Sequence, residues 1–178
     1  MEIDELITVV PYQPHWPDLF HQEQQRLQQT LTKHIFDIQH IGSTAVPGLA
    51  AKPIIDILIG LQTLSNVSFP IIALQTLSYE YLGEAGIPGR LYFRRRQERA
   101  FNIHLVQWGS ELWTNNLLLR DFLCTHPEVA SRYGQHKQEL IKSGVRTLLA
   151  YSEKKDSLVA ELLHRAQVWR ALYCSSVD

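Results

Sequence analysis

One carboxylate interrupts an otherwise apolar segment, and this segment limits the fold more than any other part of the chain. Residues 54–61 read Ile-Ile-Asp-Ile-Leu-Ile-Gly-Leu. A short apolar run rich in β-branched residues predicts a strand buried on both faces. Burying the carboxylate of Asp56 is costly unless it has a partner, and we expect a metal ion, backbone amides, or a base such as Lys52 or Arg94. The alternative to a functional role is a structural one, in which Asp56 forms an ion pair or lies at a strand end where its carboxylate reaches water.

The segments around this strand predict a mixture of helices and strands, followed by helices only. Apolar periodicity predicts a short β-like run over 7–10, strands over 36–41, 79–82, 91–96 and 101–107, and helices over 18–33, 67–77, 112–124, 127–141 and 152–173. The predicted fold class is α+β, a mixed β-sheet with an N-terminal helix and a C-terminal helical half. We expect residues 1–178 to form a single domain, with its mixed-sheet half over 1–110 and its helical half over 111–178.

Composition excludes several classes of protein. The chain is 45% hydrophobic and 20% charged, values typical of a globular protein, and its net charge is −1. The near-zero charge disfavours nucleic acid as a partner, although a local basic patch stays open. There is no apolar run of about 18 residues, so no membrane-spanning helix is predicted. Two cysteines without metal-ligand spacing, and first residues without a basic region, favour a cytoplasmic location.

Two further patterns favour the binding of an anion. Gly42 and Ser43 follow a predicted strand, where a glycine lets the backbone approach a ligand and a hydroxyl adds a donor. Five arginines fall within ten residues, namely Arg90, Arg94, Arg95, Arg96 and Arg99. Strand alternation puts Arg95 on one face, and on the other Arg90, Tyr92, Arg94 and Arg96. Guanidinium groups suit phosphate or carboxylate, but charges on an edge hairpin can also simply prevent strand-to-strand aggregation.

Residues 40–57 resemble a family signature. They read His-Ile-Gly-Ser-Thr-Ala-Val-Pro-Gly-Leu-Ala-Ala-Lys-Pro-Ile-Ile-Asp-Ile, which is similar to the signature of the GrpB-like proteins. Similar segments follow in the same order, at residues 86–90, 92–94, 102–105, 119–123 and 126–127, and at Tyr133 and Lys137. The resemblance extends from Val9 to about Arg165 and implies the nucleotidyltransferase superfamily fold.

The resemblance also implies a metal site, from which this sequence departs. In catalytic members of the superfamily, an aspartate–x–aspartate pair and a third carboxylate on a neighbouring strand hold two divalent metal ions. By this resemblance Asp56 fills the first position, Leu58 stands at the second and His104 at the third. Since leucine cannot ligate a cation, the implied cofactor is at most one divalent ion, Mg²⁺, Mn²⁺ or a softer ion such as Zn²⁺, held by Asp56 and His104. Glu84 lies in a Gly-rich loop and is a candidate to complete this site.

The resemblance implies a nucleotide or another phosphorylated small molecule as the ligand. The candidate phosphate- or ligand-binding residues are Gly42, Ser43, Thr44, Lys52, Arg90, Tyr92 and Arg94. Asp56 is expected to bind a metal or polarise an attacking hydroxyl, and His104 to support the metal or act as a base in a weak nucleotidyl transfer. The alternative function is a non-catalytic accessory domain, because a domain of this family is found joined to dephospho-coenzyme A kinase.

Overall fold

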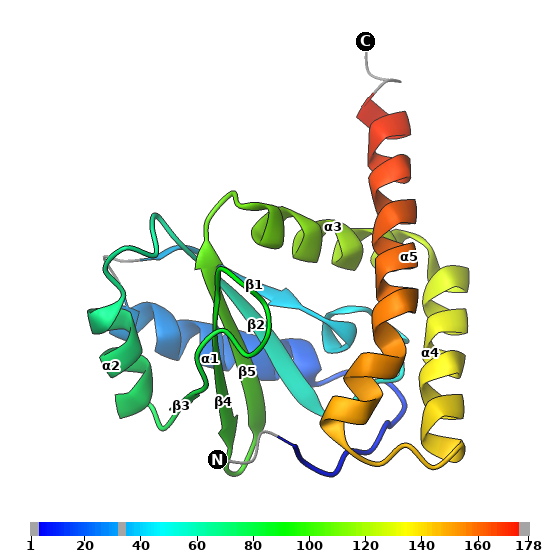
Figure 1. The fold of residues 1–178 in the computed structure, drawn as a ribbon, viewed down its shortest axis with the longest axis horizontal. Helices are drawn as coiled ribbons and strands as arrows, with labels where there is room; N and C mark the ends of the chain where they lie inside the picture. The colour runs from blue at the N-terminus through cyan, green and yellow to red at the C-terminus, as the bar shows by residue number, and fades with distance from the viewer. Residues whose placement is uncertain (1–3, 32–34, 175–178) are drawn as a thin grey trace.

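The computed structural model describes residues 4–31 and 35–174, and its strands form one mixed sheet (Figure 1). The strands are β1 (Ile35–Ile41), β2 (Ile54–Leu61), β3 (Glu80–Tyr81), β4 (Arg90–Arg96) and β5 (Ala100–Gln107). Their order is β1-β2-β5-β4-β3, in which β2 and β5 are parallel and the other neighbours are antiparallel. The predicted mixed sheet and its hairpin are therefore confirmed.

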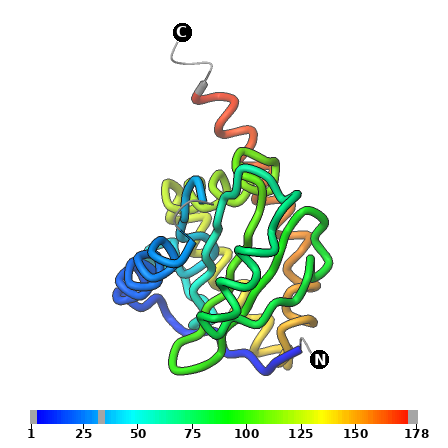
Figure 2. Tube along the Cα trace, turned by 90° about the vertical axis from the view of Figure 1, so that its left-hand side faces the viewer, coloured from blue at the N-terminus to red at the C-terminus, as the bar shows by residue number. Residues whose placement is uncertain are grey.

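The helices lie on both sides of the sheet. The N-terminal half contributes α1 (Trp16–Leu31) and α2 (Ser68–Thr76), with a 3-10 turn, η1 (Ser43–Ala45), between β1 and β2. The C-terminal half contributes α3 (Glu111–Thr125), α4 (Pro127–Lys142) and α5 (Leu148–Cys174). Residues 32 and 33 of the first predicted helix lie outside the described residues. In Figure 1 and in the perpendicular view of Figure 2, the last turns of α5 extend past the rest of the molecule.

The inner strand β2 is buried on both faces, as predicted. Ile55, Ile57 and Ile59 pack in one apolar cluster with side chains of α1, α2 and β5. Leu58 points to the opposite face and packs with Ile41, Val106 and Trp113. Full burial of each aliphatic side chain contributes about 1.5–3 kcal/mol, so this strand anchors both layers. Asp56 is the exception, because 24% of its side chain is exposed.

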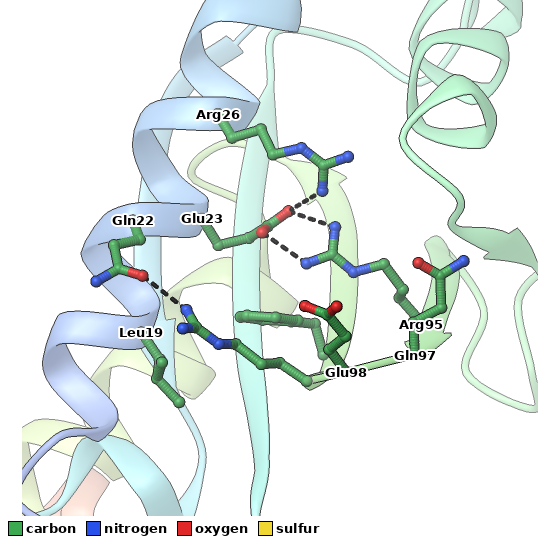
Figure 3. Close-up of a pocket in the computed structure, with 9 residues that line it drawn as sticks. Leu19, Gln22, Glu23, Arg26, Arg95, Gln97 and Glu98 are labelled. Atoms are coloured by element: carbon green, nitrogen blue, oxygen red, sulfur yellow. Dashed lines mark hydrogen bonds and ion pairs between the residues drawn. The ribbon is translucent and has the colours of Figure 1, made fainter.

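A buried ion pair joins α1 to β4 on one side of the sheet. Glu23 lies on the buried face of α1 and is only 5% exposed. Its carboxylate accepts hydrogen bonds from Arg95 at 3.1 and 2.7 Å (Figure 3). It also accepts a hydrogen bond from the Tyr79 hydroxyl at 3.0 Å. This contact confirms that Arg95 points away from the face that holds Arg96, which bonds to Asn102.

Two expectations about strands need correction. The β-like run over 7–10 contributes only an isolated bridge, Val10 with Ala51, because Pro11 has no N–H to continue a ladder. The arginine-rich strand β4 is not a sheet edge, since β3 pairs with it through Glu80 and Tyr81. Among the described helices, none combines the length and apolar character that crossing a bilayer requires.

Candidate functional site

The Gly-Ser turn and the strand carboxylate meet. Antiparallel pairing of β1 with β2 sets Ile41 opposite Asp56, so the turn that follows β1 lies beside the carboxylate. Gly42 has a φ of 72°, and a Cβ atom at this position would come within 2.6 Å of Asp56 Oδ2. Only glycine fits such a conformation and such a close approach. The two motifs that the sequence singled out therefore form one site.

Asp56 is held by polar side chains of the parallel neighbour, β5. Its Oδ1 atom accepts a hydrogen bond from Asn102 Nδ2 at 2.6 Å and lies 3.4 Å from His104 Nε2. Arg90 Nη1 lies 3.4 Å from His104 Nδ1. Because a guanidinium only donates, this contact makes Nδ1 the acceptor and directs the Nε2 proton toward Asp56. The side chains of Asp56 and His104 are 24% and 17% exposed, so a ligand can reach both.

The surroundings of Asp56 favour its charged form. Burial acts to raise the pKa of the carboxyl group, but the contact with His104, the charge of Lys52 and the hydrogen bond of Asn102 outweigh it. The net effect holds the pKa of Asp56 below its usual range. The site therefore contains a carboxylate at neutral pH.

Three lysines from distant parts of the chain surround this carboxylate. They come from the loop before β2, from α4 and from α5, and we call them the lysine cluster: Lys52, Lys137 and Lys155. Lys137 Nζ donates a hydrogen bond to Ser43 Oγ at 2.8 Å and lies 4.4 Å from the centre of the Tyr133 ring. The Tyr151 ring contacts both other amines, with its centre 5.6 Å from Lys52 Nζ and 4.8 Å from Lys155 Nζ. The helical half therefore supplies an amine, that of Lys137, to the Gly-Ser turn.

Burial lowers the pKa of every amine in the lysine cluster. Burial is the main cause that lowers the pKa of Lys137 to about 6 and that of Lys52 to about 8. Lys155 further lowers both values, whereas Asp56 raises them. Within residues 4–31 and 35–174, no carboxylate lies at ion-pair distance from a lysine of the cluster. A bound anion would favour the charged form of these amines.

The arginines of β4 are largely engaged with carboxylates. Arg94 Nε lies 2.6 Å from Glu80, at the outer side of the sheet. Arg96 pairs with Glu5 at 2.8 Å and also donates to Asn102 Oδ1 at 2.8 Å, so it supports the residue that binds Asp56. Together with the pairing of Arg95, these contacts give most of the arginine pattern a structural role.

The remaining predicted residues divide into two groups. Arg90 donates to the carbonyls of Glu84 and Ala85 at 3.1 and 2.9 Å and lies over the Tyr92 ring at 4.7 Å, which ties the Gly-rich loop to the site. Thr44 is buried, and its hydroxyl bonds to His40 Nε2 at 2.9 Å. The structure thus brings together Gly42, Ser43, Lys52, Asp56, Arg90, Tyr92 and His104. It leaves Thr44 and Arg94 outside this group.

The donor set does not fit the pair of divalent metal ions that the resemblance implies. Leu58 is fully buried among apolar side chains, so no carboxylate stands in the second position. Glu84 accepts a hydrogen bond from the Gly89 amide at 2.7 Å in its own exposed loop. Over the part of the chain that the structure describes, no three His, Cys, Asp or Glu side chains are grouped to hold a metal ion. The lysine cluster around Asp56 also disfavours a cation electrostatically.

The helical contributions to the site were missed by sequence reasoning. Tyr133 and Lys137 lie in the part of the chain that resembles the family, and this was the available signal. The sequence around Lys155 gave no such signal, because this lysine is one of several charged residues in a predicted helix (Glu-Lys-Lys-Asp, residues 153–156). Only the packing of α4 and α5 brings these amines to the Gly-Ser turn.

The fold and the site together define an α+β protein with a lysine-rich polar site between a mixed sheet and a helical half. The profile of the family described as GrpB protein matches residues 6–165 of the chain. This chain therefore belongs to the GrpB family.

Individual relatives agree with this assignment. UPF0157 protein YqkA of Bacillus subtilis is 32% identical over 92% of this chain, which spans about half of that relative (48%). Glutamate-rich protein GrpB of Alkalihalophilus pseudofirmus is 29% identical over 89% of this chain and 94% of its own length. The crystal structure of the conserved protein GrpB from Enterococcus faecalis matches with a TM-score of 0.83 at 33% identity, and the match covers 91% of this chain and 99% of that one.

Proposed function

We propose that this protein binds a nucleotide or another phosphorylated small molecule between the Gly-Ser turn and the lysine cluster, on a fold of the nucleotidyltransferase type. One observation carries the proposal: Lys137 Nζ donates to Ser43 Oγ at 2.8 Å, next to Gly42, which lies against Asp56. A hydroxyl, turn amides and amines that converge in this way match the acceptor oxygens of a phosphate group.

Each residue of the site has a role in this proposal. Ser43 and the amides of its turn hold a phosphate group, and the lysine cluster neutralises it. Asp56 keeps Asn102 and His104 oriented through its hydrogen bonds. Two-metal nucleotidyl transfer is not part of the proposal, because Leu58 stands where the second carboxylate is required.

Calorimetric titration tests the proposal. We expect saturable heat with at least one of ATP, GTP, CTP and UTP, each titrated with and without Mn²⁺. The Ser43→Ala variant is expected to bind about tenfold more weakly, because it loses one hydrogen bond to a charged group. Ser65→Ala, at an exposed serine in the loop after β2, is the matched control and should bind like the unmodified protein. No heat with any nucleotide under either condition would contradict the proposal.

A non-catalytic accessory domain is the second candidate. The observation that favours it is the length of YqkA, of which this chain spans only about half. A domain that occurs within a longer chain can serve the rest of that chain without a small-molecule ligand. The titration separates the two candidates, since an accessory domain without a ligand gives no heat.

A further inference from the structure

We propose that Lys52, Lys137 and Lys155 neutralise a polyanionic ligand in the place where related catalytic proteins use divalent metal ions. This inference rests on the proposed function and narrows the ligand class. The ligand is a phosphate chain, such as pyrophosphate or the di- or triphosphate of a nucleotide, and it binds free of metal.

The first argument is the chemistry of the donor set. Two-metal sites need several hard oxygen ligands, whereas Asp56 is accompanied here by an amide, an imidazole and a leucine. Its Oδ1 atom is already engaged by Asn102 at 2.6 Å. The groups that a metal pair needs are therefore missing from the strand that would supply them.

The second argument is the position of the amines. Lys137 contacts Ser43, the residue that would hold a phosphate, at 2.8 Å. The other two amines share contacts with the Tyr151 ring, at 5.6 and 4.8 Å, so their stems are already ordered. Ammonium groups that are fixed before binding lose little entropy when they donate to phosphate oxygens.

The third argument is the charge that these amines can carry. Burial lowers the pKa of Lys52, Lys137 and Lys155, so it favours their neutral forms. A ligand with two or more negative charges beside them would favour the charged form of all three amines at once. Magnesium bound to the same ligand would remove part of that charge, so the metal complex should bind more weakly than the free anion.

The test compares binding with and without metal. Pyrophosphate, tripolyphosphate and ATP are titrated into the full chain in EDTA and again in excess Mg²⁺ or Mn²⁺. We expect dissociation constants that are lower in EDTA than with either metal ion. Binding that is lost in EDTA and restored by either ion would overturn the inference and leave the proposed function intact. No binding under any condition would instead reject both.

Charge-removing variants test the lysines themselves. Lys52→Gln and Lys155→Gln should each weaken binding in EDTA by about tenfold, the loss expected for one charge-assisted hydrogen bond. Lys154→Gln, at the exposed neighbour on α5, is the control and should bind like the unmodified protein. We expect both variants to melt at or above the melting temperature of the unmodified protein, because each loses a buried amine that costs stability. Such a melting temperature shows that the variant is folded. Unchanged binding in folded Lys52→Gln and Lys155→Gln proteins would sink the inference.

Discussion

Lys137 is a buried lysine whose surroundings differ strongly from those of a free side chain. The residue is 1% exposed, and burial together with Lys155 and Lys52 lowers its pKa to about 6, against the opposing effect of Asp56. In the unfolded chain the same amine keeps its ordinary pKa near 10.5. Between these two pKa values the unfolded state binds one proton more than the folded state. The free energy of unfolding must therefore rise with pH over this range.

Replacing Lys137 by methionine should flatten this pH dependence. We expect the free energy of unfolding of the unmodified protein to rise by up to about 1.4 kcal/mol per unit between pH 6 and pH 8 through this residue, and Lys137→Met to lose that slope. The variant should be the more stable protein at pH 6, where the unmodified amine carries its charge in a buried place. Urea unfolding at pH 6, 7 and 8 measures both effects. Lys142→Met, at an exposed position of the same helix, is the control, and equal slopes in all three proteins would refute the prediction.

At the scale of elements, the turn between β1 and η1 depends on one glycine. Gly42 has φ 72° and ψ −172°, a region that is essentially restricted to glycine, and a Cβ atom there would meet Asp56. Gly48 has a similar φ of 77°, but a Cβ atom there would have no neighbour within 4 Å. Comparing substitutions at the two glycines therefore separates the effect of backbone strain from that of a steric clash with Asp56.

Alanine substitution at these glycines should have unequal effects. We expect Gly42→Ala to lower the free energy of unfolding by about 3 kcal/mol, the upper end for a strained backbone conformation, and to abolish phosphate binding. Gly48→Ala should lower it by about 1 kcal/mol and leave binding unchanged. Thermal unfolding and the pyrophosphate titration measure the two effects. Equal destabilisation and equal binding in both variants would show that the contact with Asp56 is unimportant.

The contact between α1 and β4 depends on the buried pair of Glu23 and Arg95. Removing one member of a buried pair leaves the other charge uncompensated, so Glu23→Ala should lower the free energy of unfolding by about 3–5 kcal/mol. Arg26 also contacts Glu23, at 3.3 Å, but its side chain is 43% exposed. Arg26→Ala should therefore lower the stability by less than about 1 kcal/mol. Urea unfolding of both variants tests this ranking, and a similar loss in each would contradict it.

At the scale of the whole molecule, periodicity along the chain predicted the layers of the fold. The alternation and apolar character of β1, β2, β4 and β5 depend on local neighbours, so the sequence alone located these strands and the helices between them. The start of α5 was predicted four residues too late, at 152 rather than Leu148, because its first turn packs against Ile7 and Val145 from elsewhere in the chain.

Only those residues of the site that lie close together in sequence could be predicted, because the others are brought in by packing. Gly42, Ser43, Lys52 and Asp56 lie close together in sequence and carry a recognisable pattern. Lys155 reaches the same place only because α5 packs against α3 and α4, which no local pattern encodes. The number of arginines in β4 favoured anion binding, but three of them pair with carboxylates of this protein. These partners, Glu5, Glu23 and Glu80, come from three other segments of the chain.

A crystal structure of the protein soaked with a nucleoside triphosphate in EDTA tests the central claim most directly. The account predicts phosphate density within hydrogen-bond distance of Ser43 Oγ and of at least two amines of the lysine cluster, with no metal ion at Asp56. Phosphate bound instead at the arginines of β4, or no phosphate density at the lysine cluster, would contradict it.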